Sequence, residues 1–178
     1  GFKLLAFDYS QIELRIAAHM SMDPHMIEAF KNNKDIHATT AAKINRVKLN
    51  EVDKKMRSEA KSVNFGILYG QGSHGLSKAT GLSFVEAKEF IEKYFENFSG
   101  VKKYLDSQID HAKEHGYVET LFGRKRYLPE IESKMGLVRK AAERMAVNTP
   151  IQGTAADMMK ISMNKVADLL FDLRNKGK

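Results

Sequence analysis

The stretch from Arg57 to Tyr69, R-S-E-A-K-S-V-N-F-G-I-L-Y, carries the most specific pattern in the chain. Charged and aromatic side chains recur in it at every fourth position, at Arg57, Lys61, Phe65 and Tyr69. On an α-helix a step of four residues nearly closes one turn, so these side chains lie along one slowly winding face. Cations bind a triphosphate and an aromatic ring can stack on a nucleobase. The helix is therefore predicted to bind a nucleotide along its length.

A second interpretation of the same stretch needs no ligand. Arg57 and Lys61 are then solvated charges, and Phe65 and Tyr69 are ordinary core residues. For any one of these residues taken alone, this interpretation is the simpler one. It is weaker for the set, because an amphipathic helix normally keeps charged and apolar side chains on separate faces.

The stretch resembles motif B of the family A DNA polymerases, whose pattern is R-x-x-x-K-x-x-x-F-G-x-x-Y-G. Every fixed position of that pattern is filled between Arg57 and Gly70. Residues 8–15, D-Y-S-Q-I-E-L-R, resemble motif A of the same family without a substitution. Residues 143–157, E-R-M-A-V-N-T-P-I-Q-G-T-A-A-D, resemble a third block, and the three blocks follow in the family's order. The resemblance spans essentially the whole chain.

Composition and charge agree with this resemblance but are not specific. The chain has 178 residues, of which 43% are hydrophobic and 29% charged, as in an ordinary globular protein with one core. Its net charge of +7 indicates, weakly, a polyanionic partner. The absence of cysteine excludes disulfides and cysteine-based zinc sites. No apolar run approaches the ~20 residues of a membrane span, and no signal peptide is visible.

The first residues have a pattern typical of a strand followed by a helix. Residues 3–7, K-L-L-A-F, end at Asp8 and predict a buried strand with a carboxylate at its C-terminal end. Ser10 and Glu13 have the spacing of a capping box, which predicts a helix through Met20. Taken alone, Asp8 is either a turn residue or a group at the sheet edge, where ligands of α/β folds bind.

The resemblance to motif A implies roles for four of these residues. Asp8 would bind both catalytic Mg²⁺ ions, and the backbone carbonyl of Tyr9 would ligate one of them. Gln11 would assist at the triphosphate. Glu13 would be the steric gate that blocks a ribose 2′-OH. One carboxylate cannot serve both as gate and as capping partner at once. Of the two roles, we favour the gate.

The resemblance to motif B implies that Arg57 and Lys61 grip phosphates as part of the catalytic set. Phe65 and Tyr69 would shape the pocket for the nucleotide and the template base. His37 lies in a D-I-H sequence that the family shares, and would contact the incoming triphosphate. Without the resemblance, a histidine near a helix start is more simply an exposed or capping residue.

The third block implies contacts to DNA. Arg144, Asn148 and Gln152, with Tyr69, would face the primer–template near the nascent base pair. Amides and arginine suit the minor-groove acceptors that all base pairs share, so they can test the shape of a pair without reading sequence. Without the resemblance, Asn148-Thr149-Pro150 is only a helix breaker and Gln152 is an ordinary polar residue.

Local signals predict the remaining elements. Asp23 is a candidate N-cap before Pro24, Asp35 begins another short helix, and Asn50 and Asp53 both fit the start of the helix that carries motif B. Ser83 with Glu86 forms a capping box for a helix to about Phe98. The apolar stripe of that helix predicts core positions at Phe84, Ala87, Phe90, Ile91, Tyr94 and Phe95. Residues 100–115 are predicted to be a helix closed by Gly116, and residues 117–128 a hairpin that turns near Gly123.

The last third of the chain is predicted to contain two helices. Residues 136–148 are helical, Pro150 interrupts the pattern, and a long amphipathic helix runs from about Gly153 to Arg174. Its predicted core residues are Met158, Ile161, Val166, Leu169 and Leu170. Residues 124–126, R-K-R, are most simply a solvated charge run, and a contact to backbone phosphates is the alternative.

We therefore expect an α+β fold that is mainly helical, with one palm strand, one hairpin and about seven helices. By the resemblance, residues 1–22 form the palm strand with motif A and the following helix. Residues 23–143 form the fingers, and residues 144–178 return into the palm. Two-metal catalysis also needs a second carboxylate, which the family carries in an H-D-E turn, motif C. The 178 residues contain no H-D-E, so we expect a piece of a longer protein that is inactive by itself.

The implied function of the longer protein is template-directed DNA synthesis. It would transfer nucleotides from dNTPs to a primer 3′-OH with two Mg²⁺ ions, on primer–template DNA. We expect a monomer without membrane attachment, in the bacterial cytoplasm and associated with the nucleoid. A single-subunit RNA polymerase is the nearest alternative, although Glu13 and Phe65 together suit exclusion of ribonucleotides. A non-catalytic nucleic-acid-binding module is an alternative of a different class.

Overall fold

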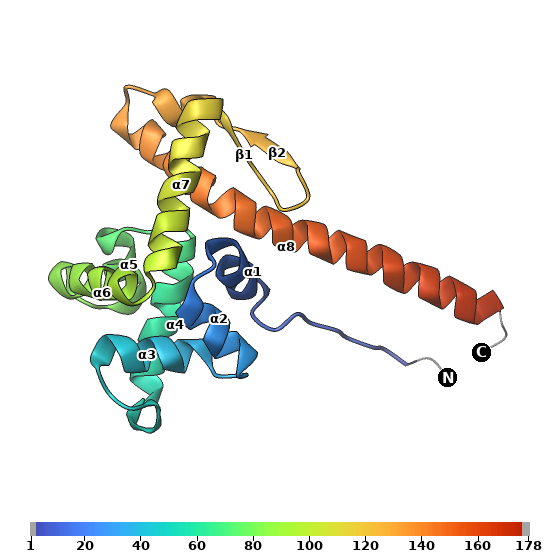
Figure 1. Ribbon diagram of the computed structural model, residues 1–178, viewed down its shortest axis with the longest axis horizontal. Coiled ribbons are helices and arrows are strands. Elements are labelled where there is room, and N and C mark those ends of the chain that lie inside the picture. The colour runs from blue at the N-terminus through green and yellow to red at the C-terminus, as the bar shows by residue number, and fades with distance from the viewer. Residues whose placement is uncertain (1–2, 176–178) are drawn as a thin grey trace.

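The computed structural model describes residues 3–175, which form a helical body, one small hairpin and one long helix that extends away from the body (Figure 1). The α-helices are α1 (Ile12–Ser21), α2 (Pro24–Lys31), α3 (Ile36–Asn45), α4 (Lys54–Leu68), α5 (Ser73–Thr80), α6 (Phe84–Asn97), α7 (Ser99–His115) and α8 (Gly136–Asn175). The remaining elements are β1 (Tyr117–Glu119), β2 (Lys125–Tyr127) and the 3₁₀ turns η1 (Leu49–Glu51) and η2 (Pro129–Glu132). This confirms the mainly helical fold class.

The helix starts that capping residues predict are confirmed for α2, α3, α4 and α6. The side chains of Asp23, Asp35 and Asp53 accept hydrogen bonds from backbone N–H groups at the starts of α2, α3 and α4. Ser83 and Glu86 form a complete capping box at the start of α6. These signals succeed because they act within one turn of helix and do not depend on distant packing.

Buried side chains from all eight α-helices form the main core. Fully buried Leu14 of α1, Val63 of α4 and Tyr94 of α6 belong to it. A smaller cluster lies under the hairpin and η2, and contains Ala112, Val118, Leu128, Ile131, Ala142 and Ala146. The stripe predicted for α6 is confirmed at the core, except that Phe84 is exposed and lies beside the ring of His74.

The hairpin turns at Gly123, whose φ of 78° lies in the left-handed region that favours glycine. The charge run beside the turn is less free than predicted. Arg124 donates to Asp157 (Nε to Oδ1, 2.9 Å) and to the carbonyl oxygen of Gly153 (3.0 Å). Arg126 donates to the hydroxyl of Thr149 at 3.4 Å. The charge run is exposed, as predicted, and its two arginines also attach the hairpin to α8.

Two expectations for the first residues are wrong. Residues 3–9 form no strand, and Leu4, Leu5 and Phe7 are exposed. A strand needs a neighbour for its backbone hydrogen bonds, and within residues 3–175 only β1 and β2 pair with each other. The capping box at Ser10 is also absent, because α1 begins at Ile12 after Gln11, whose φ is 54° and whose side chain makes no cap.

Pro150 does not interrupt the last helix, contrary to the prediction. It lies inside α8 and is buried, as are Ala146, Val147 and Ile151 of the same helix. Packing of this segment offsets the ~3 kcal/mol that a proline costs inside a helix. The hydroxyl of Thr154 donates to the Pro150 carbonyl oxygen at 2.6 Å.

The predicted core positions in the second half of α8 are mostly wrong. Met158 packs against the main core, but Ile161, Val166, Leu169 and Leu170 are exposed. In Figure 1 this half of α8 runs beyond the body, with the N-terminal segment near it. Amphipathic periodicity shows which face of a helix is apolar and does not show whether another element covers that face.

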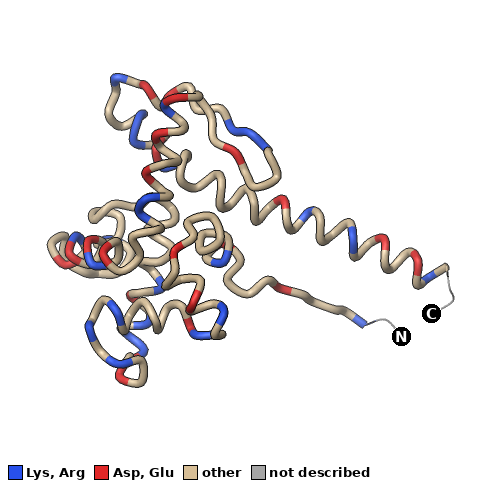
Figure 2. The backbone as a smooth tube through the Cα atoms, viewed as in Figure 1, with Lys and Arg blue, Asp and Glu red and all other residues tan. Residues whose placement is uncertain are grey.

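Basic and acidic residues are interleaved along parts of the chain. Figure 2 shows Lys and Arg interleaved with Asp and Glu along α6 and the second half of α8. None of the helices in the described part has the length and apolar content that crossing a bilayer requires.

Candidate functional site

The side chains that recur every fourth residue follow one side of α4 and its C-cap, Tyr69, and of these Phe65 also packs against the main core. Arg57 and Lys61 are exposed, and Phe65 and Tyr69 are half-buried. The rings of Phe65 and Tyr69 stack with centroids 6.0 Å apart and an interplanar angle of 26°. The opposite face of α4 is buried through Ala60, Val63, Asn64 and Ile67. One helix therefore carries two accessible cations and a pair of stacked rings in line.

Tyr69 joins the end of α4 to α1. Its hydroxyl donates to Glu13 Oε2 at 2.8 Å, and Nδ2 of Asn148 donates to its backbone carbonyl oxygen at 3.3 Å. Burial first, and then the Glu13 carboxylate, raise the pKa of Tyr69 to about 12, against an opposite effect of a hydrogen bond with Gln152. Tyr69 is therefore a protonated donor at neutral pH. Glu13, Asn148 and Gln152, which separate motifs predict, meet at this tyrosine.

Gly70 lets the end of α4 approach α8 closely. Its φ is +64°, and a Cβ at this position would lie 3.0 Å from Cγ and 3.3 Å from Cα of Arg144. Only glycine fits both the backbone conformation and the space. Arg144 itself is exposed beside this contact.

Arg57 is paired with a residue that sequence reasoning treated only as an N-cap. Its Nε donates to Asp35 Oδ2 at 2.7 Å. Although burial raises the pKa of Asp35, the hydrogen bond and charge of Arg57 and the backbone N–H groups of Ala38 and His37 lower it below its usual value. The carboxylate is therefore ionised at neutral pH and orients the guanidinium between α3 and α4.

His37 is buried, so the alternative of an exposed or capping histidine is wrong. Its exposed fraction is 3%, and its ring lies 5.8 Å from that of Phe65. Its Nδ1 lies 3.0 Å from Nδ2 of Asn64. Sequence reasoning missed Asn64. The sequence did contain a signal for Asn64, because this amide occupies a position on the apolar side of the helical pattern of α4.

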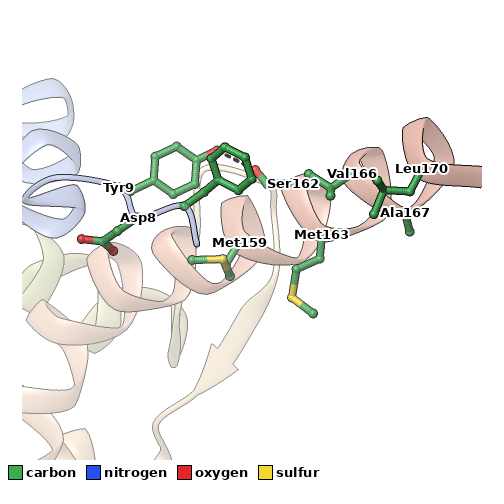
Figure 3. Close-up of a pocket in the computed structure, with 9 residues that line it drawn as sticks. Asp8, Tyr9, Met159, Ser162, Met163, Val166, Ala167 and Leu170 are labelled. Carbon is green, nitrogen blue, oxygen red and sulfur yellow. Dashed lines mark hydrogen bonds between the residues drawn. The ribbon is translucent and has the colours of Figure 1, made fainter. Parts of the chain in front are cut away.

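Asp8 and Tyr9 lie on the exposed N-terminal segment, beside α8. The Tyr9 hydroxyl and Ser162 Oγ are 2.6 Å apart, at the edge of an apolar hollow of about 590 Å³ (Figure 3). The carboxylate of Asp8 points away from the hollow (Figure 3). Between residues 3 and 175 no three His, Asp or Glu side chains gather as a metal site would require. The described residues could therefore supply some of the ligands of a magnesium site, but they do not form a complete site for two Mg²⁺ ions.

The structure thus brings the predicted residues into two groups. Around α4 lie Arg57, Lys61, Phe65 and Tyr69 with Glu13, His37, Asn148 and Gln152. Asp8 and Tyr9 form the second group, and the contact of Tyr9 is to α8. Gln11 is the residue that precedes α1.

Comparisons with known proteins show what this chain is similar to. The chain is 51% identical over 166 residues to "DNA polymerase I, thermostable" of Thermus filiformis, which covers 93% of this chain and 20% of that protein. It is 51% identical over all 178 residues to DNA polymerase I of Caldicellulosiruptor bescii, 21% of that protein. The chain thus spans about a fifth of the length of these relatives.

A solved structure has the same fold. It is described as the POL domain of Pol1 from M. smegmatis in complex with DNA primer–template and dNTP. The similarity has a TM-score of 0.88 and 44% sequence identity, and covers 93% of this chain and 29% of that one. The sequence profile of DNA polymerase family A matches residues 1–177. The chain belongs to DNA polymerase family A.

Proposed function

We propose that the chain forms the nucleotide-binding fingers and part of the palm of a DNA polymerase. The enzyme transfers a nucleotide from a dNTP to a primer 3′-OH, directed by a template. The observation that carries the proposal is the accessible face of α4, where two cations and two stacked rings lie in line. Cations bind phosphates and aromatic rings stack on nucleobases, so such an arrangement suits a nucleoside triphosphate.

Each end of the α4 face has a distinct role in this proposal. Lys61 and Arg57 bind the phosphates, and Arg57 is oriented for that by Asp35. Phe65 and Tyr69 contact the sugar and base. Glu13, held by the Tyr69 hydroxyl, occupies the space of a ribose 2′-OH and so favours deoxynucleotides over ribonucleotides.

The remaining assignments follow the same division. Residues 1–22 and 144–178 belong to the palm, and residues 23–143 to the fingers. Arg144, Asn148 and Gln152, with Tyr69, face the primer–template. The protein acts as a monomer on bacterial chromosomal DNA, in the cytoplasm at the nucleoid.

The magnesium ligands that we propose for this chain all lie in its first residues. Asp8, with the backbone carbonyl of Tyr9, supplies this chain's share of the ligands for two Mg²⁺ ions. Because the described residues do not complete such a site, the remaining ligands come from other parts of the polymerase.

The test is the replacement of Lys61 by alanine in a polymerase-length protein that carries this chain. Loss of an ammonium from a desolvated phosphate site costs on the order of 2–4 kcal/mol of transition-state stabilisation, so kcat/KM for dNTP should fall about 30-fold or more. The matched control is Lys78→Ala, which removes an exposed lysine from neighbouring α5 and should have little effect. A Lys61→Ala value within about threefold of the wild type, a loss under ~1 kcal/mol, contradicts the proposal.

A further inference from the structure

Three polar side chains lie buried between α3 and α4. Thr40 and Asn64 have exposed fractions of 0%, and His37 has 3%. All the other buried residues of these two helices are apolar. Polar groups remain in such an environment only when they are bonded to one another, because an unpaired one is costly.

The carboxamide of Asn64 lies in the middle of the three. Its Oδ1 lies 3.2 Å from the hydroxyl of Thr40, and its Nδ2 lies 3.0 Å from Nδ1 of His37. The Thr40 hydroxyl also lies 2.8 Å from the carbonyl oxygen of Ile36, so its single proton is shared between that oxygen and Oδ1 of Asn64. Because Nδ2 can only donate, Nδ1 of His37 accepts and carries no proton. The ring proton of neutral His37 is then on Nε2, which is left to bind something else.

The surroundings of His37 favour its neutral form. Burial is the largest cause that lowers its pKa, and the positive charges of Arg57 and Lys61 act in the same direction, against Asp35. The ring of Phe65 packs on the imidazole at 5.8 Å. A neutral Nε2–H can donate a hydrogen bond without adding a third positive charge beside Arg57 and Lys61.

We infer that Asn64 and Thr40 are positioning residues, which fix the tautomer of His37 so that Nε2–H donates to a phosphate oxygen of the bound nucleotide. The inference rests on the proposed function for its ligand. The bonds among the three side chains belong to the protein without nucleotide, so this half can be measured separately.

The first measurement is the protonation of the His37 ring, by NMR of the ¹⁵N-histidine-labelled chain at neutral pH. The His37 signals are identified by their loss in His37→Ala. We expect the Nε2–H tautomer in the wild type. In Asn64→Asp the new carboxylate can only accept, so a proton should move to Nδ1. Asn45→Asp is the matched control, because Asn45 is exposed on α3 and bonds only to the carbonyl oxygen of Ala41.

An Nδ1–H tautomer in the wild type overturns the inference, since the Asn64 amide would then have the opposite orientation. An unchanged ring in Asn64→Asp overturns it as well. If Asn64→Asp does not fold, Thr40→Val and Thr40→Ser provide the comparison: the first removes the hydroxyl at similar volume, and the second keeps it.

The second measurement is steady-state kinetics in a polymerase-length protein. Asn64→Asp and Thr40→Val should raise KM for dNTP about tenfold with kcat within about threefold, the loss of one charge-assisted hydrogen bond, and Thr40→Ser should restore KM. If His37→Ala raises KM but Asn64→Asp leaves it unchanged, the positioning role of Asn64 is refuted and the donor role of His37 is not. An unchanged KM in His37→Ala refutes the role of His37 as a donor, and with it the inference. The proposed function itself fails only if Lys61→Ala is also without effect.

Discussion

At the scale of single residues, the bond between Tyr69 and Glu13 connects two motifs that lie 56 positions apart in the sequence. It commits the carboxylate of Glu13 to a neighbour across the fold and not to its own helix start. The sequence offered two roles for Glu13, the gate and the capping partner. The structure excludes the capping box, because Gln11 precedes α1 without a side-chain cap.

Replacement of Glu13 by alanine tests the role that is left. Removing the side chain opens the space that a ribose 2′-OH would need, so a polymerase-length Glu13→Ala variant should incorporate ribonucleotides at a strongly increased relative rate. The measurement is the ratio of kcat/KM for dNTP and rNTP on one primer–template. Glu119→Ala, on the exposed side of β1, is the control. An unchanged ratio in Glu13→Ala leaves Glu13 as a structural partner of Tyr69 only.

At the scale of elements, the contact between the end of α4 and α8 depends on Gly70. An alanine there needs a positive φ of +64° and space that Arg144 and Val147 occupy. Gly70→Ala should therefore lower the free energy of unfolding by about 1–3 kcal/mol, as strained left-handed residues do.

Denaturant unfolding of the 178-residue chain measures this loss, and Gly72→Ala provides the control. Gly72 has a φ of −87°, and no atom lies within 4 Å of the position that an added Cβ would take. Its replacement should therefore change stability by less than ~0.5 kcal/mol. Equal effects of the two substitutions would show that α4 does not pack on α8 as closely as the distances around Gly70 require.

The elements also show which features a sequence can predict. The N-caps at Asp23, Asp35 and Asp53 were predictable because each acts on its own helix. The strand at residues 3–7 was not, because a strand depends on neighbours that the local pattern does not contain. The prediction that Pro150 interrupts the helix failed for a related reason. Pro150 is buried, and packing in this segment offsets the free energy that a proline costs inside a helix.

The site follows the same division. The four-residue spacing of Arg57 and Lys61 was enough to predict their common face on α4. The partner of Arg57, Asp35, and the partner of His37, Asn64, were not predictable, because both contacts join α3 to α4 across 22 and 27 positions. Motifs identify the residues that bind ligands, and the fold identifies the residues that orient them.

At the scale of the whole molecule, the two groups of site residues differ in how well the rest of the fold packs against them. The α4 face rests on a continuous core built from all eight α-helices, whereas Asp8 lies on an exposed segment. We therefore expect this chain to fold and to bind DNA weakly through its basic residues, with an affinity that falls steeply with salt.

Primer extension should be absent from the 178-residue chain. One carboxylate at Asp8 cannot offset the repulsion between two Mg²⁺ ions held close together. A primer-extension assay with Mg²⁺ and dNTPs compares this chain with a polymerase-length protein that includes it. Template-dependent extension at comparable rates would mean that the second metal ligand lies within these 178 residues after all.

Whether α4 binds the triphosphate is measured by nucleotide binding in the absence of chemistry. A polymerase-length protein is loaded with primer–template whose primer ends in a dideoxynucleotide, and the Kd of the next correct dNTP is measured. Arg57→Ala should raise this Kd about tenfold or more, because a charge-assisted bond to phosphate is worth about 1.5–3 kcal/mol. Arg46→Ala, an exposed arginine at the end of α3, should leave it unchanged. A Kd for Arg57→Ala within about twofold of the wild type, a loss under ~0.5 kcal/mol, would contradict the account.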